Sequence, residues 1–190
     1  MSSTFTPLIP PGKIVLTYDD YCELPNDRNR YEILDGELFI TPTPLIKHQQ
    51  VSGNLLYVLG NHVATNHLGN IFPALTDVIL AETTVVQPDI IFVSNERREI
   101  ITDRAVEGAP TLIIEILSPI TQQTDRVTKA QLYAKYGTLH YWLADPDQHT
   151  FEAYELVGDR YVITASMKSE DEFRPSLFPG LTIRLADLWA

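Results

Sequence analysis

The chain of 190 residues contains one cysteine, Cys22, and no long hydrophobic run. A lone cysteine excludes an intramolecular disulfide and a zinc cluster built from cysteines. No stretch approaches the roughly 20 apolar residues that cross a bilayer. The first residues, MSSTFTPLIPPGK, lack the basic start and the apolar core of a signal peptide. We therefore expect a cytoplasmic protein without a membrane-spanning segment.

Basic residues are also scarce, because 14 Lys and Arg stand against 25 Asp and Glu and give a net charge of −11. This acidity opposes nucleic-acid binding, where neutralisation of phosphates by Lys and Arg supplies much of the affinity. A local basic group can still attract a ligand, and acidic residues around a metal ion would account for part of the excess. The motifs GxSxG, Walker A and GxGxxG are absent, so the hydrolase and nucleotide sites that they mark are not expected.

What is present is a mixed α/β pattern, and the length fits a single domain over residues 1–190. Apolar residues at helical spacing predict a long helix over 44–67 and a second helix over 124–136, ended by Gly137. The predicted central strands are apolar runs bounded by turn residues: 75–81, 85–93, 111–117 and 140–145. The order of the core, about residues 44–145, is thus helix, three strands, helix, strand.

Two flanking segments complete the predicted fold. The N-terminal extension, 1–43, contains a short helix at 17–25 capped by Thr17 and a β-hairpin at 31–42 around an Asp-Gly turn. The C-terminal residues, 146–190, carry the strand-like runs TFEAYEL and RYVITA, which predict a β meander. The crossing helix between two strands of the core predicts one parallel pair in a mostly antiparallel sheet.

Two carboxylates interrupt apolar runs. VVQPDIIFV (85–93) has Asp89 directly after Pro88, and LIIEILSP (112–119) has Glu115 among five aliphatic residues. A charge in such a run is costly unless it is paired, hydrogen-bonded or bound to a metal. Either carboxylate could lie at a strand end, in water or against an arginine. Two of them on neighbouring strands favour a site for Mg²⁺ or Mn²⁺, which one or two carboxylates hold together with water and substrate phosphate.

Pro88-Asp89, followed by Glu115 on the next buried strand, resembles the PD-(D/E)xK motif of the restriction-endonuclease-like superfamily. The order helix, three strands, helix, strand matches the core of that superfamily. YEILDGEL, His48, DRVTKAQLYAKYG and YWLADP extend the similarity, over about residues 30–160, to the Uma-two-type family of endonucleases. The resemblance implies a metal-dependent endonuclease that hydrolyses phosphodiester bonds of DNA.

The sequence departs from the superfamily motif at Leu117, where the lysine of ExK would stand. The resemblance implies that Lys129, on the following helix, replaces it. Asp89 and Glu115 would then hold Mg²⁺ or Mn²⁺, and Lys129 would orient the attacking water or stabilise the transition-state charge. Asp125 lies four residues before Lys129, so an ordinary surface ion pair is the alternative interpretation of these two residues.

Two further residues fall on motif positions of the family. His48, near the start of the long helix, could reach a substrate phosphate or a metal-bound water. As a lone helical histidine it could equally be a structural hydrogen-bonding group. Glu32, in YEILDG, is an auxiliary candidate, and the alternative is a position on the strand surface.

Asp77 is a candidate that the motif does not contain. If strands 75–81 and 85–93 form a hairpin centred near Thr83, Asp77 lies opposite Asp89 and faces the same side. It would then bring a third carboxylate to the site. A slip of one residue would turn it to the other face.

Two other functions fit the same patterns. One is a nuclease-fold module that binds nucleic acid or a protein without cutting, which the acidity and Leu117 favour. The other is a structural homo-oligomer, such as a homodimer, in which the carboxylates are relics. Metal binding distinguishes the nuclease from the structural protein, and cleavage distinguishes it from the silent module.

Overall fold

The computed structural model describes residues 14–27 and 29–190, and its main feature is a mixed sheet of six strands. Their spatial order is β11-β10-β9-β8-β6-β3. The bounds of these strands are β3 (Gly69–Pro73), β6 (Ile90–Ser94), β8 (Leu112–Ile116), β9 (His140–Asp145), β10 (Thr150–Val157) and β11 (Arg160–Lys168). Strands β8 and β9 are parallel and the other neighbouring pairs are antiparallel. The predicted parallel pair in a mostly antiparallel sheet is confirmed.

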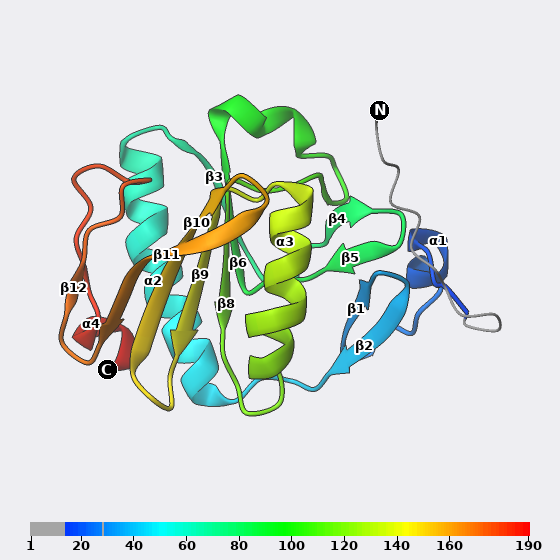
Figure 1. Ribbon diagram of the computed structural model, residues 1–190, viewed down its shortest axis with the longest axis horizontal. Coiled ribbons are helices and arrows are strands. Elements are labelled where there is room, and N and C mark those ends of the chain that lie inside the picture. Colours follow the sequence, from blue (N-terminus) through cyan, green and yellow to red (C-terminus); the bar gives the residue numbers. More distant parts are fainter. Residues whose placement is uncertain (1–13, 28) are drawn as a thin grey trace.

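Helices cover both faces of this sheet (Figure 1). The predicted long helix is α2 (Ile46–Thr65), and it packs against one face, while α3 (Ala130–Tyr136) packs against the other. Side chains alternate along β8, so that Ile114 enters the core beneath α2 and Ile113 enters the core beneath α3. Glu115 follows Ile113 by two residues. The same alternation therefore directs Glu115 towards the α3 side of the sheet.

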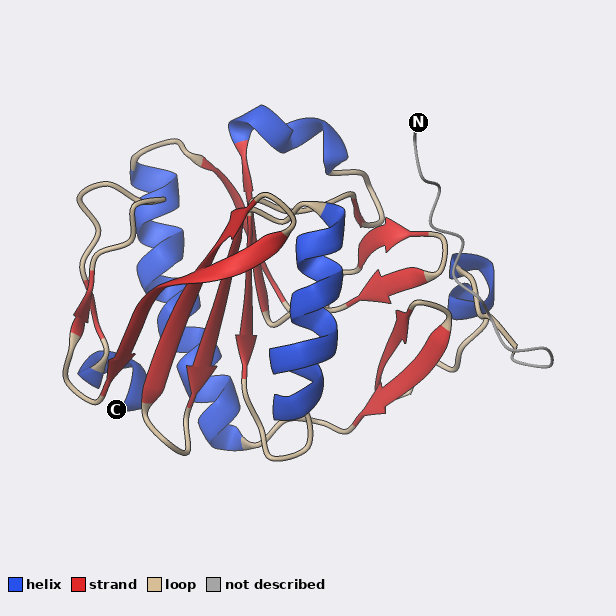
Figure 2. Cartoon of the chain, viewed as in Figure 1, coloured by secondary structure: helices blue, strands red, loops and turns tan. Residues whose placement is uncertain are grey.

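A second, five-stranded sheet lies on the α3 side, in the order β2-β1-β5-β4-β7 (Figure 2). The bounds of these strands are β1 (Arg30–Leu34), β2 (Glu37–Thr41), β4 (Val78–Ala81), β5 (Thr84–Val86) and β7 (Val106–Glu107). Strands β1 and β2 form the predicted hairpin, with Asp35 and Gly36 both at positive φ, 47° and 83°. Asp-Gly favours this turn because glycine adopts positive φ without strain.

The predicted pairing of residues 75–81 with 85–93 holds only for a short hairpin. The second half of the predicted strand, β6, pairs with other strands. Strands β4 and β5 pair with Val78 opposite Val86, and the chain then leaves their sheet at Gln87 and Pro88. Proline has no N–H to continue the ladder. The following strand, β6, joins the six-stranded sheet between β8 and β3. Asp89 therefore stands at the junction of the two sheets, at the entry of a buried strand.

The helix predicted over 124–136 has two parts. It begins as the π-helical segment η2 (Thr124–Lys129), which was not predicted, and continues as α3. Gly137 ends it at φ 89°, as its position in the sequence suggested. π-helical turns are rare and occur frequently at functional sites. Here the turn carries two buried ionisable residues, Asp125 and Lys129.

The terminal segments add small elements around the sheets. Helix α1 (Tyr18–Cys22) follows the predicted cap Thr17, whose hydroxyl accepts a hydrogen bond from the backbone of Asp20. Strands β9, β10 and β11 form the predicted meander. The remaining elements are η1 (Asn95–Ile100), β12 (Glu172–Phe173), β13 (Ile183–Arg184) and α4 (Ala186–Trp189). Phe173, Phe178 and Leu185 from the C-terminal part pack into the core beneath α2.

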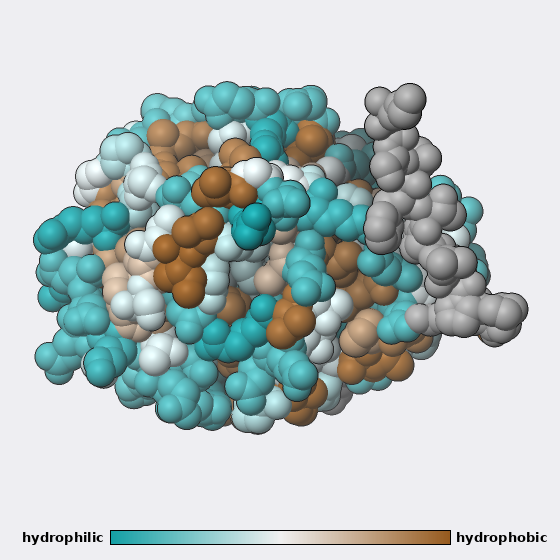
Figure 3. Space-filling model, viewed as in Figure 1, coloured by the Kyte–Doolittle hydropathy of each residue, from teal (hydrophilic) through white to brown (hydrophobic). Residues whose placement is uncertain are grey.

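On the face of the molecule that Figure 3 presents, hydrophobic areas are separated by hydrophilic side chains. Strand β11, at the edge of the larger sheet, contributes the exposed Val162 and Ile163. No helix within residues 14–27 and 29–190 is long and apolar enough to cross a bilayer. The homodimer considered from the sequence stays a prediction.

Candidate active site

A cluster of ionisable side chains lies where the two sheets, α2 and η2 meet. We call it the carboxylate cluster. Its members are Arg30 and Glu32 from β1, His48 from α2, Asp89 before β6, Glu115 from β8, and Asp125 and Lys129 from η2. Six of these seven side chains are buried, and Arg30 is 12% exposed. The fold thus brings together six of the seven residues predicted from the sequence.

Asp89 is held by groups from three different elements. Its Oδ2 accepts a hydrogen bond from the backbone N–H of Ile116 at 2.7 Å and lies 3.2 Å from Nε2 of His48. Its Oδ1 accepts from Nη1 of Arg30 at 2.8 Å. Burial by itself would raise the pKa of Asp89, but the hydrogen bond from His48 and the charge of Arg30 lower it to about 2. Asp89 is therefore an ionised carboxylate held in a fixed orientation.

Lys129 is enclosed by three carboxylates. Its Nζ lies 2.9 Å from Oε2 of Glu32, 3.1 Å from Oε1 of Glu115 and 3.4 Å from Oδ1 of Asp125. Burial alone would lower the pKa of Lys129, but these three carboxylates raise it above its ordinary value. The surface ion pair considered for Asp125 and Lys129 is wrong, because both side chains are only 2% exposed.

Glu115 has one satisfied oxygen and one without a partner. Oε1 accepts from the hydroxyl of Tyr133 at 2.7 Å and from Lys129. Oε2 is buried and has no hydrogen-bond partner among the described residues. Burial raises the pKa of Glu115 to about 8, against the lowering effect of Lys129. Its free oxygen is thus a buried acceptor without a donor.

Glu32 is an inner member of the cluster, and the strand-surface interpretation is wrong because the residue is 2% exposed. Its Oε2 contacts Lys129, and its Oε1 accepts the backbone N–H of Gln87 at 2.9 Å. Gln87 directly precedes the Pro88-Asp89 pair. Glu32 therefore connects the lysine on η2 with the point where the chain passes from one sheet to the other.

Asp77 lies apart from these contacts, and its predicted position opposite Asp89 is wrong. The register Val78 opposite Val86 brings Asp77 to Gln87 instead. Oδ1 of Asp77 accepts from Nε2 of Gln87 and from the hydroxyl of Tyr21, each at 2.7 Å. The β4–β5 hairpin is tighter than expected, because it turns at Glu82 and Thr83 and then ends before Asp89.

Two residues of the site were not predicted from the sequence. Arg30 contacts Asp89, and Tyr133 donates to Glu115. Arg30 stands two residues before Glu32 on β1, so period-two alternation gives them the same face. That spacing is the only signal for Arg30. Tyr133 lies four residues after Lys129, and helical spacing would have grouped the two.

The charges of the carboxylate cluster do not balance. With Glu32, Asp89, Glu115 and Asp125 ionised, four negative charges face the two positive charges of Arg30 and Lys129, which leaves −2. A net charge in a buried region costs free energy unless a counter-charge compensates it. Burial is the first cause of the raised pKa values of Glu115 and Asp125, and the neighbouring carboxylates add to it against the lowering effect of Lys129.

The donor set fits a hard divalent cation. Carboxylate oxygens are the ligands that Mg²⁺ and Mn²⁺ prefer, and Oε2 of Glu115 is an unpartnered oxygen of this kind. Within residues 14–27 and 29–190, no three His, Cys, Asp or Glu side chains are arranged to hold a metal by themselves. Mg²⁺ commonly takes only one or two carboxylates and completes its shell with water and phosphate. The absence of a three-ligand group is compatible with such an ion.

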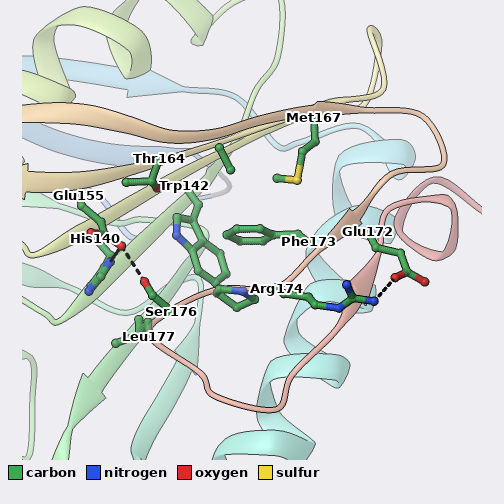
Figure 4. Close-up of a pocket in the computed structure, with 12 residues that line it drawn as sticks. His140, Trp142, Glu155, Thr164, Met167, Glu172, Phe173, Arg174, Ser176 and Leu177 are labelled. Carbon is green, nitrogen blue, oxygen red and sulfur yellow. Dashed lines mark hydrogen bonds and ion pairs between the residues drawn. The ribbon is translucent and has the colours of Figure 1, made fainter.

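A cavity of the molecule lies away from this cluster. It has a volume of about 400 Å³ and is bounded by β9, β10, β11 and residues 172–177 (Figure 4). Trp142, Met167 and Phe173 form its apolar side, and Ser176 donates a hydrogen bond to Glu155 at 2.7 Å on its polar side. No member of the carboxylate cluster lines it. The candidate site is therefore the cluster and not this cavity.

The fold is a mixed α/β fold with carboxylates on neighbouring strands beside a helical lysine, and the family comparison assigns it to a restriction-endonuclease-like class. A model of the Uma2 family, described as "Putative restriction endonuclease", matches residues 18–186. The chain belongs to the Uma2 family.

A solved structure supports the fold assignment. It is described as a "putative nuclease belonging to DUF820" from Anabaena variabilis, with a TM-score of 0.75 and 24% sequence identity. The match covers 92% of this chain and 97% of that chain. At this identity the similarity concerns the fold. No curated protein matches this chain.

Proposed function

We propose that this protein is an endonuclease that uses Mg²⁺ or Mn²⁺ to hydrolyse phosphodiester bonds of DNA. The observation that carries the proposal is the buried, unpartnered Oε2 of Glu115 in a cluster where four carboxyl groups face two permanent cations. A buried acceptor without a donor costs roughly 1–3 kcal/mol. A divalent cation at Glu115 and Asp89 would supply both the missing partner and the missing charge.

The residues of the cluster divide the work of such a site. Asp89 and Glu115 would hold the metal. A bound Mg²⁺ or Mn²⁺ supplies positive charge to a phosphate and lowers the pKa of an attached water. His48 fixes Asp89 through Nε2, and Lys129 fixes Glu115 through Oε1. Lys129 would thereby stand in for the lysine of the ExK motif, whose position is occupied by Leu117 in this sequence.

Glu32 and Asp125 would not bind the metal directly and would act through Lys129. Both contact Lys129, so they hold its ammonium against Glu115. The net charge of −11 implies that DNA binding depends on the metal and on low salt, since few basic groups are available to neutralise phosphates. DNA is the substrate that the family description favours.

A plasmid assay tests the function directly. We expect the purified protein to nick or linearise supercoiled DNA with Mn²⁺ or Mg²⁺ and to lose this activity when EDTA removes the metal. The measurement is conversion of supercoiled plasmid on a gel, with metal binding followed by calorimetry. A protein that binds Mn²⁺ but leaves the plasmid intact is the silent module. A protein that binds no metal is the structural alternative.

Metal affinity should depend on pH in a defined direction. The carboxyl of Glu115 has a pKa of about 8 in the metal-free protein and must lose its proton to bind a cation. Metal and proton therefore compete, and the apparent Mn²⁺ affinity should rise from about pH 6 to about pH 8. Titration calorimetry in two buffers of different ionisation enthalpy measures both the affinity and the protons released. A flat profile without proton release would contradict the assignment of Glu115 as a ligand.

A further inference from the structure

The two cations of the site, Lys129 and Arg30, differ in how many N–H donors remain available for a substrate. An ammonium has three N–H donors, and three carboxylate oxygens lie within 3.4 Å of Nζ of Lys129. The Lys129 side chain is 2% exposed. It is enclosed by negative partners, and Nζ donates a hydrogen bond to Oε1 of Glu115. Lys129 is therefore poorly placed to contact a phosphate.

Arg30 has N–H groups that make no hydrogen bond within the described part of the chain. Its Nη1 donates to Oδ1 of Asp89 at 2.8 Å and to the backbone carbonyl of Gln87 at 3.1 Å. A guanidinium carries five N–H donors, and these two bonds use only Nη1. Within the described part of the chain, Nε and Nη2 of Arg30 have no hydrogen-bond acceptor. The side chain is 12% exposed, six times the fraction of Lys129.

Arg30 also has the right chemistry and position for a phosphate. The planar guanidinium matches phosphate oxygens through parallel N–H bonds, which the ammonium of lysine cannot do. Its contact with Asp89 places it beside a carboxylate proposed to hold the metal. A guanidinium keeps its positive charge at every accessible pH.

We propose that Arg30 is the residue that contacts the scissile phosphate of the substrate, and that Lys129 is a positioning residue that holds Glu32, Glu115 and Asp125. This inference rests on the proposed nuclease function and deepens it. The phosphate contact would then come from Arg30 on β1 of the five-stranded sheet and not from Lys129 on η2. Arg30 uses one edge of its fork for Asp89 and presents the other to the substrate.

The salt dependence of DNA binding provides the test. Removal of one Arg–phosphate interaction reduces the slope of log K against log salt by about one. The measurement is binding of a labelled DNA duplex, followed by fluorescence anisotropy with Ca²⁺ at fixed concentration and increasing NaCl. Arg30→Gln should bind about tenfold more weakly, with the slope reduced by about one.

A second arginine supplies the matched control. Arg97 is also partly buried, and its Nη1 donates to the carbonyls of Ala109 and Gly137 near the start of β8 and β9. Arg97→Gln removes one positive charge away from the cluster. It should keep the wild-type slope. An unchanged slope in Arg30→Gln, or an equal change in both variants, overturns the proposal.

Arg30→Lys keeps the test decisive if Arg30→Gln does not fold. It retains the charge beside Asp89, so Mn²⁺ affinity should stay within about twofold, while the loss of the fork lowers kcat at least about tenfold. Full activity in Arg30→Lys, or a loss of Mn²⁺ affinity as large as the loss of kcat, overturns the assignment. Arg30-dependent DNA binding without cleavage would reject only the nuclease function. If the wild-type protein does not bind DNA, both proposals fail.

Discussion

Lys129→Met should lower the free energy of unfolding by about 3–5 kcal/mol, because removing one partner of a buried ion pair leaves the others uncompensated. Nζ of Lys129 contacts Glu32, Glu115 and Asp125, and its loss removes one of the two permanent positive charges of the cluster. Methionine fills a similar volume, so the effect reports charge more than packing. The measurement is urea unfolding of the metal-free protein, followed by circular dichroism.

Lys135→Met is the control for this prediction. Lys135 lies on α3, further along the same helical segment than Lys129, and pairs with Asp35 at 3.0 Å, but its side chain is 56% exposed. Exposed ion pairs contribute about 0–1 kcal/mol. The two variants remove the same charge from the same helical segment and differ in burial. Equal losses of stability would contradict the account of Lys129 as the counter-ion of the cluster.

The sequence predicts the core of this fold well where hydrophobic spacing is long and regular. Helix α2 and the run from β8 through α3 to β9 were predicted because burial on one or both faces leaves a clear pattern. Strand β3 was missed, since Gly69–Pro73 offers only two large apolar residues between glycine and proline. Without β3, the sequence pattern pairs residues 85–93 only with their neighbour in sequence, and the predicted register of Asp77 depends on that pairing.

The residues of the site also differ in how clearly the sequence indicates them. Asp89 and Glu115 were conspicuous because a carboxylate is rare in an apolar run. Asp125 and Lys129 show the limit of local spacing, since an i,i+4 pair has the same pattern on the surface and in the interior. Arg30 begins a strand, where an arginine is ordinarily exposed. Its role depends on the sheet junction at Gln87 and Pro88, a long-range contact that no local pattern contains.

Glu115→Gln should weaken Mn²⁺ binding about 100-fold or more and abolish DNA cleavage, while the protein stays folded. Glutamine keeps the oxygen that accepts from Tyr133 and Lys129 but replaces the free, ionisable Oε2. The variant resembles the protonated form of Glu115. Calorimetry measures the affinity, and the plasmid assay measures cleavage. Asp77→Asn is the control, because Asp77 bonds to Tyr21 and Gln87 outside the cluster.

Thermal stability separates a metal ligand from a structural carboxylate. The pKa of Glu115 is raised to about 8, so the folded protein binds this proton more tightly than the unfolded chain. That contribution is complete below about pH 4.5 and is lost as the pH rises through about 8. Glu115→Gln cannot lose it, so in the metal-free state its melting temperature should exceed that of the wild type increasingly towards pH 8.

Asp77→Asn should bind Mn²⁺ within about twofold of the wild type and show no such gain. If Glu115→Gln melts lower at every pH, Glu115 is a structural carboxylate. If Asp77→Asn loses Mn²⁺ as strongly as Glu115→Gln, the site extends to the β4–β5 hairpin.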